Sequence, residues 1–67
     1  MIKAQLVNLG RHDTNKMVNV KDISELREEI GKHILSPGWG MEETEEPGTW
    51  EVYAGLRTVG HVRILEN

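Results

Sequence analysis

The amino-acid sequence predicts a two-layer α+β domain in which one helix packs on a four-stranded sheet. Residues 22–36 carry a single apolar stripe at helical spacing, which is typical of a helix that covers one surface. Two segments before this helix and two after it alternate apolar and polar residues, as half-buried strands do. A chain of 67 residues is long enough for one core. We therefore expect one domain over residues 1–67, with the order ββαββ.

The ends of the predicted helix are marked by residues that favour helix termini. Asp22 is a good N-cap, and Glu25 stands three residues later, as in a capping box. Pro37 and Gly38 follow the stripe, and proline disfavours helical geometry at the residue before it. The apolar stripe has to pack on the flanking strands.

Two strands are predicted before the helix, at residues 2–9 and 16–20, with a polar turn between them. Their hairpin register is predicted from the apolar pattern. With Leu6 opposite Val18, the apolar side chains of both strands share one face, and a slip of one residue would scatter them.

Two more strands are predicted after the helix, at residues 49–54 and 58–65. Gly60 should face inward and leave room for the ring of Trp50 or for a neighbouring side chain. Residues 36–48 connect the helix to these strands, and we expect them to form a long acidic loop, since most connections are much shorter.

A right-handed crossover through the helix favours the sheet order 2-1-4-3, with the first and last strands central and parallel. This topology resembles that of ubiquitin-like β-grasp domains. Carrier and modifier proteins of that family end in Gly-Gly, whereas this chain ends in Leu65-Glu66-Asn67. The resemblance therefore implies a fold and not a carrier role. A wholly antiparallel sheet is the alternative.

The net charge of −3 is unevenly distributed along the chain. Four of the 11 acidic residues lie within residues 42–46, so the rest of the chain is nearly neutral. A broad basic surface for nucleic acid is missing. The chain has no cysteine, no signal-like segment and no apolar run long enough for a membrane span. We expect a cytoplasmic protein without membrane contact, and a nuclear location stays open.

Motifs for catalysis, metal or cofactor binding are absent from the sequence. His12, His33 and His61 lack paired ligand spacing, and each has an ordinary explanation as a turn, helix-end or strand residue. No phosphate-binding glycine motif occurs. We therefore expect neither an enzyme nor a cofactor.

The long loop is the first candidate interaction site. A tryptophan and a methionine precede four glutamates, and aromatic residues beside charges suit an interface. The predicted partner-binding residues are Trp39, Met41, Glu42, Glu43, Glu45 and Glu46. The competing interpretation is a solvated loop whose Trp39 folds back over the helix end.

The open face of the sheet, away from the helix, is the second candidate. It should carry more apolar side chains than a monomer usually exposes, which predicts a homodimer. The predicted self-association residues are Val7, Leu9, Met17, Tyr53, Val59 and Leu65. Parallel pairing would place Val7 near Leu65. Alternatively, the loop or the C-terminal residues cover this face.

These features predict a small non-enzymatic domain for protein interaction or regulation, of a kind that phages and mobile elements often encode. Its partner would be another protein of unknown identity. The alternative is a nucleic-acid-binding domain that uses Tyr53, His61 and Arg63 on the open face of the sheet.

Overall fold

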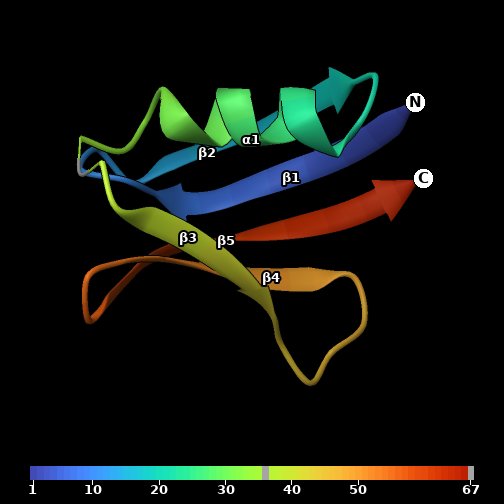
Figure 1. The fold of residues 1–67 in the computed structure, drawn as a ribbon. Helices are drawn as coiled ribbons and strands as arrows, with labels where there is room; N and C mark the ends of the chain where they lie inside the picture. Colours follow the sequence, from blue (N-terminus) through green and yellow to red (C-terminus); the bar gives the residue numbers. More distant parts are fainter. Residues whose placement is uncertain (36, 67) are drawn as a thin grey trace.

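A computed structural model describes residues 1–35 and 37–66 as one helix and five strands in the order ββαβββ (Figure 1). Ser36, where the predicted helix ends and the predicted loop begins, lies outside the described residues, as does Asn67. The elements are β1 (Ile2–Leu9), β2 (Thr14–Val20), α1 (Ile23–Gly31), β3 (Trp39–Glu43), β4 (Thr49–Ala54) and β5 (Arg57–Glu66).

The five strands form a single antiparallel sheet in the order β2-β1-β5-β4-β3. The helix α1 lies along β1 and β2, on one side of the twisted sheet (Figure 1). The α+β class is confirmed, and the four predicted strands are neighbours in the predicted order. The parallel arrangement and the four-strand count are wrong.

Both errors have one cause, which is the strand β3. Trp39–Glu43 was predicted as part of a loop, but it pairs with β4 from Trp39 opposite Ala54 to Glu43 opposite Trp50. An extra strand after the helix reverses the direction of every later strand. As a result β5 runs antiparallel to β1, and the β-grasp arrangement is not formed.

The hairpin β1–β2 keeps the predicted faces but not the predicted register. Ala4, and not Leu6, lies opposite Val18, and Leu6 lies opposite Lys16. A shift of two residues leaves every side chain on its own face, because the side-chain period of a strand is two. The apolar pattern therefore determines which side chains share a face, but it does not distinguish between registers that differ by two residues.

The helix begins as predicted and ends earlier. The Asp22 side chain accepts a hydrogen bond from the Glu25 backbone N–H at 3.0 Å, which satisfies one of the free donors of the first turn. α1 ends at Gly31, with Lys32 as its C-cap, so it has nine residues. Leu26 and Ile30 are its fully buried side chains.

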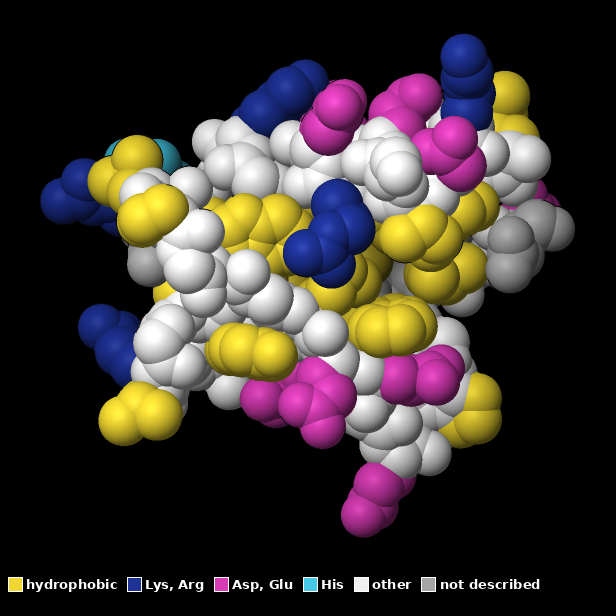
Figure 2. Space-filling view, in the orientation of Figure 1, with side chains coloured by type: hydrophobic (Ala, Val, Ile, Leu, Met, Phe, Trp, Pro, Cys, Tyr) yellow, Lys and Arg dark blue, Asp and Glu magenta, His cyan; other side chains and the backbone are white. Residues whose placement is uncertain are grey.

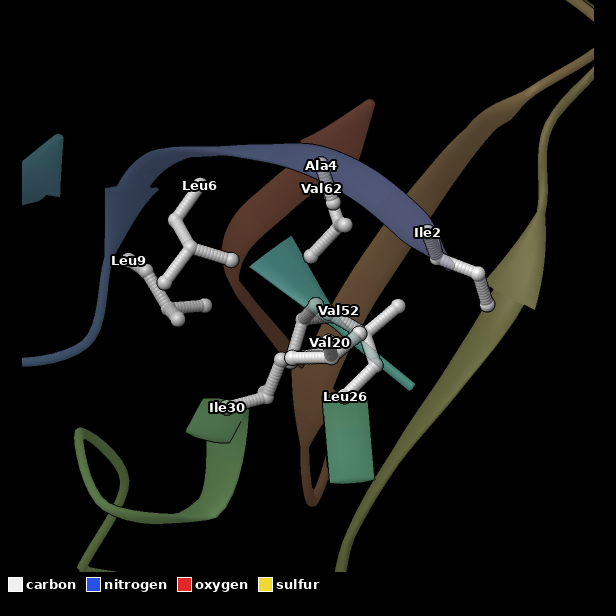
Figure 3. Packing of buried hydrophobic residues seen from close by; sticks show 9 residues of the cluster. All are labelled: Ile2, Ala4, Leu6, Leu9, Val20, Leu26, Ile30, Val52 and Val62. Atoms are coloured by element: carbon white, nitrogen blue, oxygen red, sulfur yellow. The ribbon is translucent and has the colours of Figure 1, made fainter. Parts of the chain in front are cut away.

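The core lies between α1 and the inner face of the sheet (Figure 3). Its nine buried residues come from α1 and from every strand except β3, and they are Ile2, Ala4, Leu6, Leu9, Val20, Leu26, Ile30, Val52 and Val62. Leu9 was predicted on the open face, and this is wrong. Asn8 has a left-handed φ of 48°, and the β1–β2 register shifts between Leu6 and Leu9, so the alternation breaks and Leu9 turns inward.

Gly60 leaves room for Leu9 and not for the ring of Trp50. A Cβ at Gly60 would lie 2.7 Å from the Leu9 Cα and 2.9 Å from its Cδ1. The close approach of β1 and β5 at this point therefore requires glycine.

Candidate functional site

The hairpin β3–β4 carries the predicted partner-binding residues and divides them between its two sides. Trp39, Met41 and Glu43 lie on the helix side of β3, and Gly40 and Glu42 lie on its open side, because side chains alternate along a strand. Glu45 and Glu46 follow in the turn to β4.

Trp39 packs back against the helix, as the competing interpretation of the loop proposed. The Arg27 guanidinium lies 4.9 Å from the centroid of its ring, within the range of a cation–π contact. One helix turn after Arg27, a Cβ at Gly31 would lie 3.6 Å from the Trp39 ring, at van der Waals distance. Trp39 is nevertheless only half-buried, so its ring combines a fixed position with an accessible surface.

An apolar strip continues from Trp39 along the hairpin. Met41, Trp50 and Ile64 are partly buried and pack against the core. Figure 2 shows hydrophobic side chains gathered in a band between α1 and the β3–β4 hairpin, with acidic side chains on both sides of the band. We call Trp39, Met41, Trp50 and Ile64 the apolar strip.

The four glutamates beside the strip are exposed and lack basic partners. Among residues 1–35 and 37–66, the one ion pair joins Lys32 and Glu29 at 3.0 Å. The hydrogen bond that Lys32 donates to Glu29 lowers the pKa of that carboxyl. Glu43 instead accepts a hydrogen bond from the Gly48 backbone N–H at 3.2 Å. The negative charge of the hairpin is therefore left for a partner or for solvent.

The turn of the hairpin is held by Thr44. Its backbone N–H donates to the Thr49 carbonyl at 2.9 Å, and its hydroxyl accepts from the Glu46 backbone N–H at 3.2 Å. Glu45 and Glu46 are thus attached to an ordered turn, next to the strip.

Two acidic residues face each other on the open side of the hairpin. Glu42 lies directly opposite Glu51, and like charges at this spacing are destabilising. In the neighbouring β4–β5 pair, Glu51 lies opposite His61. The pair Glu42–Glu51 makes the open side of β3 acidic at a cost to the free protein.

β3 is one of the two edge strands of the sheet, paired only with β4 in the described part of the chain. Every second residue of an edge strand directs its N–H and C=O away from the sheet, where another strand can pair with them. β3 therefore combines a free edge, an apolar side and an acidic side.

The predicted self-association residues do not form one patch. Leu9 is in the core, and Val59 is half-buried and packs against the core. Val7 lies opposite His61, whereas Leu65 lies four residues further along β5, about 13 Å away. Antiparallel pairing has separated the residues that parallel pairing would have gathered.

Met17 and Tyr53, the other predicted members of that patch, are also apart. Met17 is 46% exposed on the edge strand β2. Tyr53, on β4, lies opposite Gly40 of β3. Its ring covers that glycine, since a Cβ at Gly40 would lie 2.9 Å from the tyrosine hydroxyl.

The residues of the nucleic-acid alternative are on the open face as predicted. His61 and Arg63 follow one another along β5, and Tyr53 lies on the neighbouring β4. Glu51 lies between them on β4, opposite His61, and Glu42 lies beside it. Acidic residues thus interrupt the surface that would have to contact phosphates.

Sequence reasoning missed a recess at the opposite end of the molecule from the β3–β4 turn. Arg11, His33, Arg57 and His61 all line it, although they are far apart in the sequence. No local motif could have revealed this set, because it depends on the antiparallel sheet. Among the residues the structure describes, no group of three His, Cys, Asp or Glu side chains could hold a metal ion.

The described helix is too short and too polar to cross a membrane. The chain was also compared with known proteins, and no family model, no curated protein and no solved structure matches it.

Proposed function

We propose that the chain is a non-enzymatic protein-interaction domain that binds an extended segment of another protein at the edge of β3. The observation that supports this most directly is the free edge of β3 with two different sides. Half-buried Trp39 and Met41 lie on one side, and exposed Glu42 lies on the other.

The alternation along β3 defines the chemistry of the partner. A strand added to the edge directs successive side chains to opposite faces. Those on the helix side would meet Trp39 and Met41, and those on the open side would meet Glu42. A segment that alternates apolar and basic residues complements both sides.

Charge complementarity is the second support for this proposal. A lysine or arginine beside Glu42 would relieve its repulsion with Glu51 across the hairpin. Glu43, Glu45 and Glu46 extend the negative potential and would steer a basic segment toward the edge.

The two other candidate functions have less support. Dispersal of Val7, Leu9, Met17, Tyr53, Val59 and Leu65 removes the argument for a homodimer through the open face. The acidic residues between Tyr53, His61 and Arg63 weaken the argument for nucleic acid.

Charged residues on an edge strand also prevent edge-to-edge aggregation. This role and partner binding can be separated with Glu42→Lys/Glu43→Lys. The variant keeps charge on the edge, and two copies still repel each other, but it reverses the sign that a basic partner needs.

The experiment is a calorimetric titration with a short peptide in which lysine alternates with valine. A peptide with glutamate in place of lysine is the control ligand. The lysine peptide should bind the unmodified protein, and binding should weaken at least about tenfold in Glu42→Lys/Glu43→Lys. The control Glu28→Lys, which reverses one charge on the exposed side of α1, should leave binding unchanged.

Two results would refute the proposal. One is equal binding of the lysine and glutamate peptides, and the other is equal binding of the lysine peptide by Glu42→Lys/Glu43→Lys and by Glu28→Lys. A short single-stranded oligonucleotide is titrated in parallel at low salt. If it binds and the lysine peptide does not, the nucleic-acid alternative replaces this proposal.

A further inference from the structure

The recess at the end of the molecule has the size and the lining of a small-molecule site. Its volume is about 720 Å³, within the range of about 300–1,000 Å³ that is typical of ligand pockets. Three segments form it: the turn between β1 and β2, the residues after α1, and the hairpin of β4 and β5 (Figure 1).

The three segments are fixed to one another by the backbone. Gly10 has a left-handed φ of 75°, and its backbone N–H donates to the Val59 carbonyl at 2.8 Å. A side chain at Gly10 would collide with the His33 carbonyl, so the turn and the end of the helix are in direct contact. The recess is therefore built into the fold.

Positive charge dominates the polar lining of the recess. Arg11 and Arg57 come from different hairpins, and Asp13 is the one carboxylate among the described lining residues. Neither arginine takes part in an ion pair within residues 1–35 and 37–66. A guanidinium group binds phosphate through two parallel hydrogen bonds, so two free arginines favour a phosphate over a weaker anion.

His33 adds an unsatisfied polar group to this end of the molecule. His33 is among the residues that line the recess, and its Nε2 is the one buried side-chain nitrogen or oxygen of the described chain without a hydrogen-bond partner. A buried polar group without a partner is unfavourable, so this end of the molecule holds an unsatisfied polar atom next to the recess.

The lining also includes apolar residues, which indicate the rest of the ligand, beside the polar Asn8, Thr58 and His61. Ile34, Leu35 and Val59 are the larger apolar residues among them. Leu35 is largely exposed. An apolar group attached to the phosphate would cover these side chains.

We propose that this recess binds a phosphate monoester with an apolar body, its phosphate held by Arg11 and Arg57 and its body packed on Ile34, Leu35 and Val59. Such a group occurs in soluble phosphate esters and in the headgroup of phosphatidic acid, and the experiment distinguishes these sources. This inference is independent of the binding proposed for β3.

The experiment follows backbone amide shifts of the labelled protein during titration. The soluble probes are phenyl phosphate, inorganic phosphate and benzyl alcohol. In a second arm, cosedimentation is measured with phosphatidylcholine vesicles that contain or lack phosphatidic acid. The variant is Arg11→Gln/Arg57→Gln, in which both exposed side chains lose their charge. The control is Lys21→Gln, between β2 and α1 at the other end of the molecule.

Phenyl phosphate should bind more tightly than inorganic phosphate or benzyl alcohol, with shifts at residues 10–13, 33–35 and 57–61. Arg11→Gln/Arg57→Gln should weaken binding at least about tenfold, and Lys21→Gln should not. Binding only to vesicles with phosphatidic acid, lost in the same variant, supports the lipid source. Absence of binding in both arms, or equal binding by the arginine variant, would overturn the proposal.

Discussion

Gly60 shows how one residue connects the core with the recess. It lets β5 approach β1 closely enough for Leu9 to enter the core, and it also lines the recess. The sheet is irregular at this point, since Val52 pairs with Gly60 and Tyr53 with Thr58, which leaves Val59 without a partner on β4. The Val59 carbonyl is then free to accept from Gly10.

Gly60→Ala is expected to destabilise the protein by about 1–3 kcal/mol, because the new Cβ would force β1 and β5 apart. Chemical denaturation measures the change in the free energy of unfolding. Gly38→Ala is the control, since nothing lies within 4 Å of a Cβ there, and it should change stability by less than about 0.5 kcal/mol. Equal losses in the two variants would show that the close contact has been misassigned.

Leu9 illustrates why single residues are hard to place from the sequence. Strict alternation assigns it to the open face together with Val7. Asn8 instead adopts a left-handed φ, and its backbone N–H donates a hydrogen bond to the Asn15 side-chain oxygen at 3.0 Å. An asparagine tolerates this conformation better than most residues, but nothing in the local pattern requires it.

At the scale of the elements, the helix was predictable and β3 was only partly so. The apolar stripe and Asp22 mark the start of α1 directly, whereas its end at Gly31 comes before Pro37 and Gly38. In β3, Trp39 and Met41 do alternate with Gly40 and Glu42, which is a strand pattern. The glycines and the dense charge favoured a loop, because both are rare in strands. Pairing with β4 outweighs these preferences.

The packing of α1 is tested by Ile30→Ala. Ile30 is fully buried, so the loss of its side chain should destabilise the protein by about 2–5 kcal/mol. Ile23, on the same helix, is 48% exposed, and Ile23→Ala should cost about 1 kcal/mol or less. Thermal denaturation of both variants measures this difference. A similar loss for Ile23→Ala would mean that another face of the helix is buried.

The repulsion between Glu42 and Glu51 makes a prediction about β3 itself. Glu42→Lys should stabilise the free protein by about 0.2–1 kcal/mol, because it replaces like charges with opposite charges across the hairpin. Glu45→Lys makes the same charge change in the turn and should have a smaller effect. The gain of Glu42→Lys should shrink in high salt. If Glu42→Lys destabilises the protein, Glu42 and Glu51 do not face each other as described.

At the scale of the whole molecule, charge is divided between two ends. One end carries Arg11 in the β1–β2 turn, Lys32 at the end of the helix and Arg57 at the start of β5. The other end carries Glu45 and Glu46 in the β3–β4 turn (Figure 1). The acidic cluster was visible in the sequence. The basic end was not, because its residues come together only through strand order and direction.

The direction of the strands also decides which surfaces exist. The predicted neighbours of the four strands are correct, yet one additional strand reverses β4 and β5 and disperses the predicted apolar patch. The strand Trp39–Glu43 therefore disperses the surface expected for self-association, and it turns part of the expected binding loop into an edge strand.

The central claim is that a basic, extended segment pairs with the edge of β3, and amide hydrogen exchange tests it most directly. Exchange is measured for each backbone amide with and without the alternating lysine–valine peptide. Pairing should slow exchange at the outward-facing amides of Trp39–Glu43 and leave those of the other edge strand, Thr14–Val20, unchanged. Protection at Thr14–Val20 or on the open face, with none at Trp39–Glu43, would contradict the claim.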